Sequence, residues 1–272
     1  MTAPLLMIPG PTPVQPDVLA ALAEPVRSHT GGENAATMLR VQAALRRLVG
    51  GARSRVHVFA GSGTLAMESA LVSHAQPGDR VVVVSHGYFG DRFAEIADAV
   101  GMQTDVLRAE WGTHAQADEL RALIESSTMP AIVCITHVDT SSGVQSRCDE
   151  LARASRAAAP HSVIVLDGVC ATGGIEESMG EWDVDVVVTG AQKALGVPPG
   201  LAIVAVSPRA AERRARLGGV RAYYADLARW DRSVDDPQMY FSTHAVSLLR
   251  ALEVSLEDIE AEGLEARHAR HR

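Results

Sequence analysis

Short runs of β-branched and other apolar residues alternate along the chain with longer segments in which apolar residues recur at helical spacing. Strands are expected at Val56 to Ala60, Arg80 to Ser85, Ala131 to Thr136, Ser162 to Asp167, Val184 to Thr189 and Leu201 to Val206. Helices are expected at Leu65 to Ala75, Asp91 to Val100, Ala117 to Glu125 and Thr243 to Glu262. Runs such as VVVV and VIVL are apolar on both faces, which is typical of strands covered by helices on each side. The pattern predicts an α/β protein with a three-layer α/β/α arrangement and a mostly parallel central sheet.

The two ends of the chain depart from this alternation. The segment PGPTPVQP is rich in proline and glycine, so residues 1–20 are predicted to form an extended arm ahead of a large domain at 21–242. Residues 243–272 are predicted to form a connecting helix, and the basic tail from Arg267 to Arg272 is interpreted as its solvated end. Because ligands of parallel α/β sheets bind at the carboxyl ends of strands, the search for chemistry begins there.

Composition narrows the function classes. The net charge of -8 disfavours a nucleic-acid partner, because an acidic surface repels the phosphate backbone. The three cysteines show no CxxC spacing, which argues against a disulfide framework or a zinc site. His57, His86 and His137 also lack ligand spacing, so they are interpreted as core or turn residues and no metal is predicted. Without a signal peptide or a membrane-spanning run, we expect a cytoplasmic protein with no membrane partner.

The first candidate for chemistry is AGSGT, residues 60–64, between a predicted strand and a predicted helix. Glycines allow a tight turn, and the N–H groups at the helix start, with the Ser62 and Thr64 hydroxyls, form an anion cradle around Gly63. The alternative is a purely structural turn. Because the spacing matches neither nucleotide-binding glycine motif, a monophosphate is the better expectation.

Two further candidates follow buried strands. Asp167 ends the strand VIVLD, where a carboxylate is costly to bury unless a cation meets it; it could equally be a cap or turn residue. Gln192 and Lys193 follow the strand DVDVVV and precede PPG. A random lysine is a solvated surface residue, but a partly desolvated amine at a strand end can form a Schiff base with an aldehyde.

The order of these three features gives them a common meaning. The chain resembles the class V, fold-type I aminotransferases, most closely the alanine–glyoxylate and serine–glyoxylate group. The similarity is carried by PGPT, SGxGxxxxExAL, HxxTSxGV, DxVxxxGG and GxQKALxxPPG motifs along essentially the whole sequence. The corresponding segments here are PGPT, AGSGTLAMESAL, HVDTSSGV, DGVCATGG and GAQKALGVPPG. This resemblance implies pyridoxal phosphate as the cofactor and residues 21–242 as its binding domain.

The resemblance also implies roles for individual residues. Lys193 would form the Schiff base and later move a proton, and Asp167 would pair with the pyridine nitrogen. Ser62, Gly63, Thr64 and Gln192 would bind the phosphate, and Val169 would lie beside the ring. Phe89 would be an aromatic ring stacked on the pyridine, and Thr140 and Ser141 would lie near its phenolic oxygen. Tyr240 and Thr243 would reach a partner's phosphate across a homodimer interface. Gly10 would lie near the substrate.

Simpler interpretations exist for several of these matches. Phe89 could be core packing, Thr140 and Ser141 could form a turn without a role, and Thr243 could cap a helix. Relatives continue into a small C-terminal domain with an arginine that binds the substrate carboxylate, and this domain is expected to be absent here.

The implied reaction moves an amino group from alanine or serine to glyoxylate or pyruvate by a ping-pong mechanism. The alternatives are a pyridoxal-phosphate lyase or desulfurase, a 2-aminoethylphosphonate transaminase, or a catalytically impaired protein that binds the cofactor.

Overall fold

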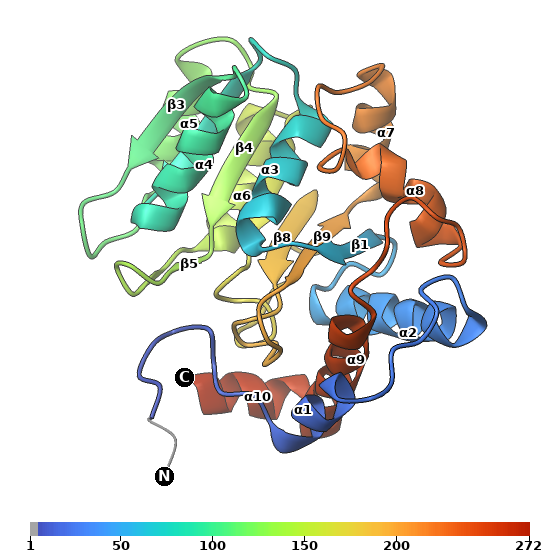
Figure 1. Cartoon of the computed structure of the whole chain (residues 1–272). Helices are drawn as coiled ribbons and strands as arrows, with labels where there is room; N and C mark the ends of the chain where they lie inside the picture. The colour runs from blue at the N-terminus through green and yellow to red at the C-terminus, as the bar shows by residue number, and fades with distance from the viewer. Residues whose placement is uncertain (1–4) are drawn as a thin grey trace.

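The structure is a computed structural model that describes residues 5–272, and its centre is a seven-stranded sheet (Figure 1). The sheet order is β1-β9-β8-β7-β4-β2-β3. Only β9 runs antiparallel to its neighbours, so the expected mostly parallel sheet is confirmed. The strands are β1 (Arg55–Ala60), β2 (Arg80–Ser85), β3 (Gln103–Arg108), β4 (Ile132–Thr136), β7 (Val163–Asp167), β8 (Val186–Gly190) and β9 (Leu201–Val206), with β5 (Val138–Asp139) and β6 (Val144–Gln145) in a separate small hairpin.

Helices cover both faces of the sheet, as the apolar runs require. In β2, Val81 and Val83 pack into one core cluster while Val82 and Val84 pack into the other, so successive side chains face opposite layers. The helices are α1 (Pro16–Leu22), α2 (Gly32–Leu48), α3 (Gly63–His74), α4 (Tyr88–Ala99), α5 (Ala117–Glu125), α6 (Cys148–Ala158), α7 (Pro208–Arg216), α8 (Leu227–Asp235), α9 (Val246–Glu262) and α10 (Leu264–His271).

The ends of the chain differ from their predicted boundaries. The expected boundary between residues 20 and 21 falls inside α1, whose first residue, Pro16, suits a helix start because it has no N–H to leave unpaired. The expected helix at 243–272 is two helices, because Gly263 adopts a φ of 81° between α9 and α10. The interpretation of Arg267 as part of a solvated tail is wrong, since only 12% of its side chain is exposed.

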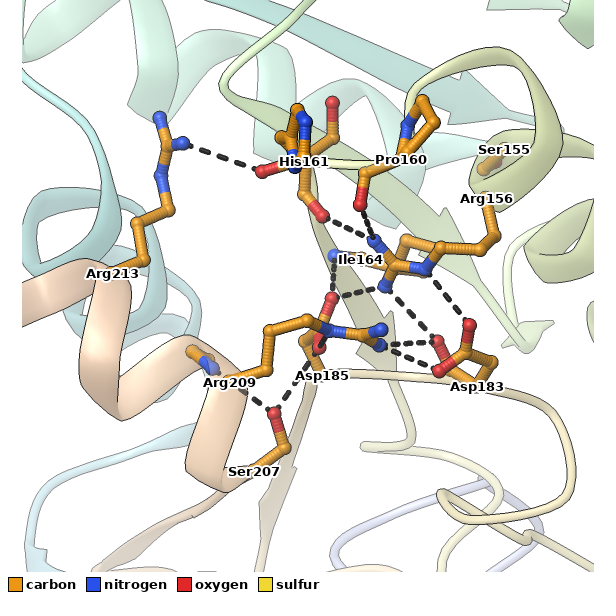
Figure 2. A network of polar contacts seen from close by, with 12 residues as sticks. Ser155, Arg156, Pro160, His161, Ile164, Asp183, Asp185, Ser207, Arg209 and Arg213 are labelled. Atoms are coloured by element: carbon orange, nitrogen blue, oxygen red, sulfur yellow. Dashed lines mark hydrogen bonds and ion pairs between the residues drawn. The ribbon is translucent and has the colours of Figure 1, made fainter.

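A polar network stabilises the amino ends of β7 and β8 (Figure 2). Asp185 is fully buried, and it accepts hydrogen bonds from Arg156 Nη2 at 2.5 Å and Arg209 Nε at 2.7 Å. The Ile164 N–H and the Ser207 hydroxyl donate to the same carboxylate. Because every oxygen of Asp185 has charged or backbone donors, its burial is compensated and this end of the sheet is tied to α6 and α7.

Candidate active site

The predicted site residues lie in loops at one edge of the sheet. β1, β8, β7 and β4 run in the same direction, because β9 is antiparallel to both β1 and β8. Their carboxyl ends therefore meet at a common edge. The loop after β1 carries Ser62, β7 ends with Asp167, and the loop after β8 carries Lys193.

The start of α3 is an open anion site. Its N-cap, Ser62, has extended backbone angles, and its side chain makes no capping hydrogen bond. The first N–H groups of any helix lack intrahelical acceptors and carry the positive end of the helix dipole. A Cβ on Gly63 would lie 2.7 Å from Val169 Cγ2, so only glycine allows this close approach. Val169 thereby connects the start of α3 to the loop that follows Asp167.

The side chain of Gln192 lies beside the start of α3. A Cβ built on Gly190 would be 2.8 Å from Gln192 Oε1 and 3.2 Å from the Gly63 nitrogen, so the Gln192 amide and the first turn of α3 face one small space. The Gln192 Oε1 atom is buried and has no hydrogen-bond partner among residues 5–272. A buried amide oxygen without a partner is costly, which indicates that this space suits a polar ligand.

Asp167 is a buried carboxyl at the end of β7. One of its oxygens, Oδ1, accepts a hydrogen bond from the Val169 N–H at 2.9 Å. Burial raises the pKa of Asp167 to about 7, and the neighbouring carboxylates of Asp139 and Glu177 add to this effect. The group therefore favours a proton, or a ligand that brings positive charge, in the position beside it.

Lys193 is half-buried and faces the N-terminal segment. A Cβ built on Gly10 would clash with Lys193 Cδ, so the backbone at Gly10 approaches the lysine side chain closely. The expected place of Gly10 near the substrate stays a prediction. Cys170 lies close enough to Lys193 and Asp167 for both charges to act on its thiol, while burial raises the pKa of that thiol. Cys170 Sγ is also 3.9 Å from Thr140 Oγ1. Thr140 therefore contacts a thiol on which the charges of Lys193 and Asp167 also act.

Phe89 and Ser141 are organised by Asp139, a residue that the sequence interpretation missed. Asp139 is fully buried and accepts hydrogen bonds from the Phe89 and Gly90 N–H groups, at 2.8 and 3.1 Å. It thereby caps the start of α4. The Ser141 hydroxyl donates to Asp139 and accepts from the Tyr88 N–H, so it belongs to the same cap. The Ser141 hydroxyl is thus used in the cap of α4, whereas the Thr140 hydroxyl is not, so Thr140 is the better candidate to bind a ligand.

Arg92 is a second residue that the sequence interpretation did not identify. Its guanidinium donates to Thr64 Oγ1 at 3.2 Å and lies 5.3 Å from the centre of the Phe89 ring. It also stacks on Tyr88, to whose hydroxyl it donates. The spacing of Tyr88 and Arg92, one helical turn apart, could have suggested this contact. Arg92 links two residues of the predicted site and brings positive charge to it.

Tyr240 and Thr243 lie outside this group. Tyr240 is 64% exposed and packs edge-on against His29, with 5.3 Å between the ring centres. Thr243 is exposed, and it does not cap α9, because that helix begins at Val246 with Ala245 as its N-cap. The helix-cap interpretation of Thr243 is therefore wrong, and its role toward a partner chain stays a prediction.

The three histidines considered as ligands have protein partners. His57 contacts Asp231, His86 contacts Ser146, and His137 contacts Glu177. Within residues 5–272 no group of three or more His, Cys, Asp or Glu side chains has an arrangement that could hold a metal ion. Over the same residues, none of the helices combines the length and the apolar character that a membrane span requires.

Two cavities of about 630 and 610 Å³ are lined in part by the later half of the loop between β7 and β8. The first is lined by His137, Glu177, Trp182 and residues of α10, and the second by residues around Gly51 and Arg209. Neither includes Lys193 or Ser62. At the predicted site Ser62, Thr64 and Tyr88 are exposed on the surface of this chain.

Comparison with known proteins decides the family. The family model for Aminotransferase class-V matches residues 7–272. The chain belongs to the class-V aminotransferases. Alanine–glyoxylate aminotransferase 1 of Saccharomyces cerevisiae is 34% identical over 281 residues, covering 98% of this chain and 73% of the yeast protein. A Synechococcus protein named as the small subunit of a soluble hydrogenase is 36% identical, covering 98% of this chain and 69% of its own length.

Solved structures agree with this assignment. Ureidoglycine–glyoxylate aminotransferase of Bacillus subtilis has a TM-score of 0.94 and 29% identity, and the match covers 100% of this chain and 70% of that one. Alanine–glyoxylate aminotransferase of Nostoc has the same TM-score and identity, with 72% of its chain covered. This class-V aminotransferase is therefore an enzyme with the fold of that family.

The sequence interpretation missed one feature of this class-V aminotransferase that can be read directly from its amino-acid composition. Lys193 is the only lysine among its 272 residues, and the other 24 of its 25 Lys and Arg residues are arginines. Arginine does not form Schiff bases under conditions in which lysine does, because its guanidinium stays protonated. Any aldehyde chemistry on a side-chain amine of this chain must therefore take place at residue 193.

Proposed function

We propose that this aminotransferase uses pyridoxal phosphate, bound as a Schiff base to Lys193, to move an amino group from alanine or serine to glyoxylate or pyruvate. The observation that carries the proposal is the convergence of the sole lysine, a buried carboxyl and an open helix start on one edge of the sheet. These three features supply an amine, an acid and a phosphate site.

The residues present fit this cofactor. The exposed start of α3 and the unpartnered Gln192 amide suit a phosphate, with Ser62, Gly63 and Thr64 as its backbone and hydroxyl donors. The protonated pyridine would meet Asp167, whose buried carboxyl has no ion pair with an arginine or lysine among residues 5–272. Phe89 and Val169 offer apolar surface on which a flat ring would pack, and Thr140 offers a hydroxyl to its phenolic oxygen. When bound, the cofactor would supply the electron sink that labilises the substrate Cα–H bond.

Lys193 would then have two tasks. Its amine would hold the cofactor, and once freed it would accept the proton from the substrate Cα. The close approach of Gly10 to the Lys193 side chain restricts the directions in which the amine can swing. Gly10 thereby borders the space that a substrate would enter.

The substrates are proposed from the relatives and from the chemistry of the site. The yeast relative is named for alanine and glyoxylate, and a relative from Hyphomicrobium methylovorum, 31% identical, is named for serine and glyoxylate. A two-stage exchange, in which the first oxo acid leaves before the second enters, is proposed from the resemblance to the glyoxylate aminotransferases.

We also propose that the site is completed in a homodimer. Leu5 and Met7 are 81% and 84% exposed, just ahead of the segment that contacts Lys193, and Tyr240 is 64% exposed. Exposed apolar residues of this kind are typical of surfaces that another chain covers. Tyr240 and Thr243 would then reach the phosphate of the partner chain. Light scattering coupled to size-exclusion chromatography would test the mass, and a monomer with full activity would contradict the proposal.

The deciding experiment follows the cofactor by absorbance. We expect the chain, loaded with pyridoxal phosphate, to be yellow, to lose its visible absorbance when L-alanine or L-serine is added, and to regain it with glyoxylate. Oxo acid should form in the first stage in one equivalent per site. A Lys193→Arg variant keeps the positive charge but cannot form the Schiff base, so it should show neither spectral change.

The other outcomes correspond to the alternative functions. Release of ammonia or sulfide without loss of the visible band would indicate a lyase or desulfurase. Turnover of 2-aminoethylphosphonate in preference to both amino acids would indicate that transaminase activity. A yellow protein that no amino donor bleaches would indicate cofactor binding without catalysis.

A further inference from the structure

The loop that carries Lys193 is held by hydrogen bonds from three distant parts of the chain. The Thr12 N–H donates to the Gln192 carbonyl at 3.1 Å, and the Thr12 hydroxyl donates to the Lys193 carbonyl at 3.0 Å. The Ser255 hydroxyl of α9 donates to the Leu195 carbonyl. The N-terminal segment and α9 thus fix the backbone on both sides of the lysine.

Arg267 of α10 provides the fourth contact to the lysine loop, and it also contacts a second loop. Its Nη2 donates to the Ala194 carbonyl at 2.5 Å, and its Nε donates to the Gly173 carbonyl at 2.5 Å. Gly173 lies in the loop that begins at Asp167 and adopts a φ of 82°. One guanidinium therefore bridges the loop of the lysine and the loop of the buried carboxyl.

The placement of Arg267 depends on the bend at Gly263. There the backbone adopts a φ of 81°, so α10 leaves the direction of α9 and crosses beneath the loops at the carboxyl edge of the sheet (Figure 1). Glu262 accepts from Arg267 Nη1 at 2.7 Å and from Arg270 Nε at 2.6 Å. Only 12% of the Arg267 side chain is exposed, whereas Arg270 is 57% exposed.

We propose that Arg267 is a positioning residue for the Lys193 amine, because it holds the lysine loop at a fixed separation from the loop that follows Asp167. The inference rests on the proposed role of Lys193 as the residue that binds pyridoxal phosphate. The planar guanidinium is suited to this task, since its donors have a rigid geometry. An ammonium group at the same place would be a point charge without the fixed fork.

The inference separates two properties of the cofactor site. Of the proposed phosphate donors, Ser62, Gly63 and Thr64 lie at the start of α3, and only Gln192 belongs to the lysine loop. Among the described residues no hydrogen bond joins Arg267 to α3 or to Gln192. Loss of Arg267 should therefore leave phosphate binding largely intact and reduce the share of bound cofactor that is linked to Lys193. A residue that only supported the fold would lower both together.

The test compares Arg267→Met, Arg267→Lys and, as the matched control, Arg270→Met, which removes a neighbouring arginine that contacts the same glutamate. Each chain is saturated with pyridoxal phosphate, the noncovalently and covalently bound fractions are separated by borohydride reduction, and the adduct at residue 193 is quantified by mass spectrometry. Because there is no second lysine, only the chain's α-amino group can compete. We expect roughly tenfold less adduct at saturation in Arg267→Met, corresponding to the loss of one charged hydrogen bond. Partial recovery is expected in Arg267→Lys, and no change in Arg270→Met.

A second measurement works without the cofactor. In the apo chain, reductive ¹³C-methylation labels Lys193 and the α-amino group alone, so the lysine gives its own NMR signal. We expect this signal to sharpen in Arg267→Met, because the side chain gains mobility, and to be unchanged in Arg270→Met.

The outcomes distinguish the inference from the proposed function. If the wild-type chain forms no adduct at residue 193, the proposed function fails, and the NMR comparison still tests whether Arg267 holds the lysine. Equal adduct in wild type and Arg267→Met, or an unchanged lysine signal, would overturn the inference. Should Arg267→Met fail to fold by circular dichroism, Thr12→Val removes the hydroxyl that donates to the Lys193 carbonyl and must lower the adduct instead.

Discussion

Lys193 can be tested with unusual sharpness because no other lysine competes with it. We expect borohydride reduction in the presence of pyridoxal phosphate to attach one cofactor per chain, on the peptide that contains residue 193. In Lys193→Arg this adduct should disappear while the chain remains folded, because arginine preserves the charge and much of the bulk of the side chain. Peptide mapping by mass spectrometry would check both chains. Modification confined to the α-amino group of the wild-type chain would contradict the assignment.

Asp167 gives a prediction about pH. Burial raises its pKa from the ordinary 3.8 to about 7, so the folded chain retains a proton that the unfolded chain releases. Between these values the unfolded state binds fewer protons, and the contribution of Asp167 to the free energy of unfolding falls as the pH rises from about 4 to about 7. Asp167→Asn removes the buried charge while keeping an oxygen for the Val169 N–H.

Without cofactor, Asp167→Asn should therefore gain stability relative to wild type as the pH rises, by at most about 4 kcal/mol for a shift of this size. Calorimetric melting curves from about pH 5 to about pH 8 would measure the difference. With pyridoxal phosphate the order should reverse, because the variant loses the charge that pairs with the pyridine. Asp118→Asn, at an exposed position in the first turn of α5, serves as the control. Parallel melting curves for wild type and Asp167→Asn would contradict the prediction.

The start of α4 depends on one buried carboxylate. Asp139 accepts from the Phe89, Gly90 and Ser141 N–H groups and from the Ser141 hydroxyl. Asp139→Ala would remove the acceptor that these donors share, among them the buried Gly90 N–H, which should lower the free energy of unfolding by about 2–4 kcal/mol. It should also weaken pyridoxal phosphate binding, because Phe89 loses its fixed position. Urea unfolding and cofactor titration would measure the two effects.

The control for this cap is Ser142→Ala. Ser142 lies in the same turn, and its hydroxyl donates only to the Asp139 carbonyl, at 3.4 Å. A change of less than about 0.5 kcal/mol is expected there. A loss as large as that of Asp139→Ala would mean that the turn as a whole, and not the carboxylate, holds the start of α4.

The elements that the sequence predicted are those whose local pattern agrees with their place in the fold. β2 and β9 have the expected boundaries, because the VVVV centre of β2 and the LAIVAV sequence of β9 are apolar runs buried on two faces. β3 was not predicted, since this edge strand is half exposed and its sequence, QTDVLR, mixes polar and apolar residues. α2 was also missed, because its buried face includes Asn34, Thr37 and Gln42, which carry no hydrophobic signal.

The same distinction applies to the candidate site. The sequence placed Ser62, Asp167 and Lys193 after strands, and parallel strand order then brings their loops to one edge. Contacts between side chains distant in sequence could not be read in this way. Arg267 reaches Ala194 across 73 positions, and only the bend at Gly263 makes that contact possible. Asp139 had a local signal, a carboxylate after a strand, but its acceptor role depends on where α4 begins.

The molecule as a whole separates stability and chemistry between the two edges of its sheet. The carboxyl edge carries the predicted site, where the Asp167 carboxyl is buried and the Gln192 amide oxygen has no hydrogen-bond partner among residues 5–272. The amino edge carries the network around Asp185, in which every buried charge has a partner (Figure 2). Buried polar groups therefore lower the stability of the fold at the carboxyl edge, where a ligand is expected to bind. At the amino edge, where no ligand is expected, their burial is compensated by ion pairs and hydrogen bonds.

This separation predicts that damage to the amino edge changes stability without changing cofactor binding. Arg156 is 15% exposed and donates to Asp183, Asp185 and the carbonyls of Pro160 and Ser162, whereas Arg209 is 46% exposed. Arg156→Met removes the more buried partner of Asp185 and should cost about 3–5 kcal/mol, because it leaves a buried charge poorly compensated. Arg209→Met, the matched control, should cost about 1 kcal/mol, since water replaces part of its contacts.

Urea unfolding would give the two free energies, and pyridoxal phosphate titration of the folded variants would give their affinities. We expect the affinities of both variants to equal that of wild type, because β7 and β8 carry their predicted site residues at the opposite ends from this network. If Arg156→Met loses affinity while still folded, the two edges are coupled through β7 or β8, and the rigid central strands transmit strain from Asp185 to Asp167. Equal stability losses in the two variants would instead mean that solvent exposure does not determine the strength of these ion pairs.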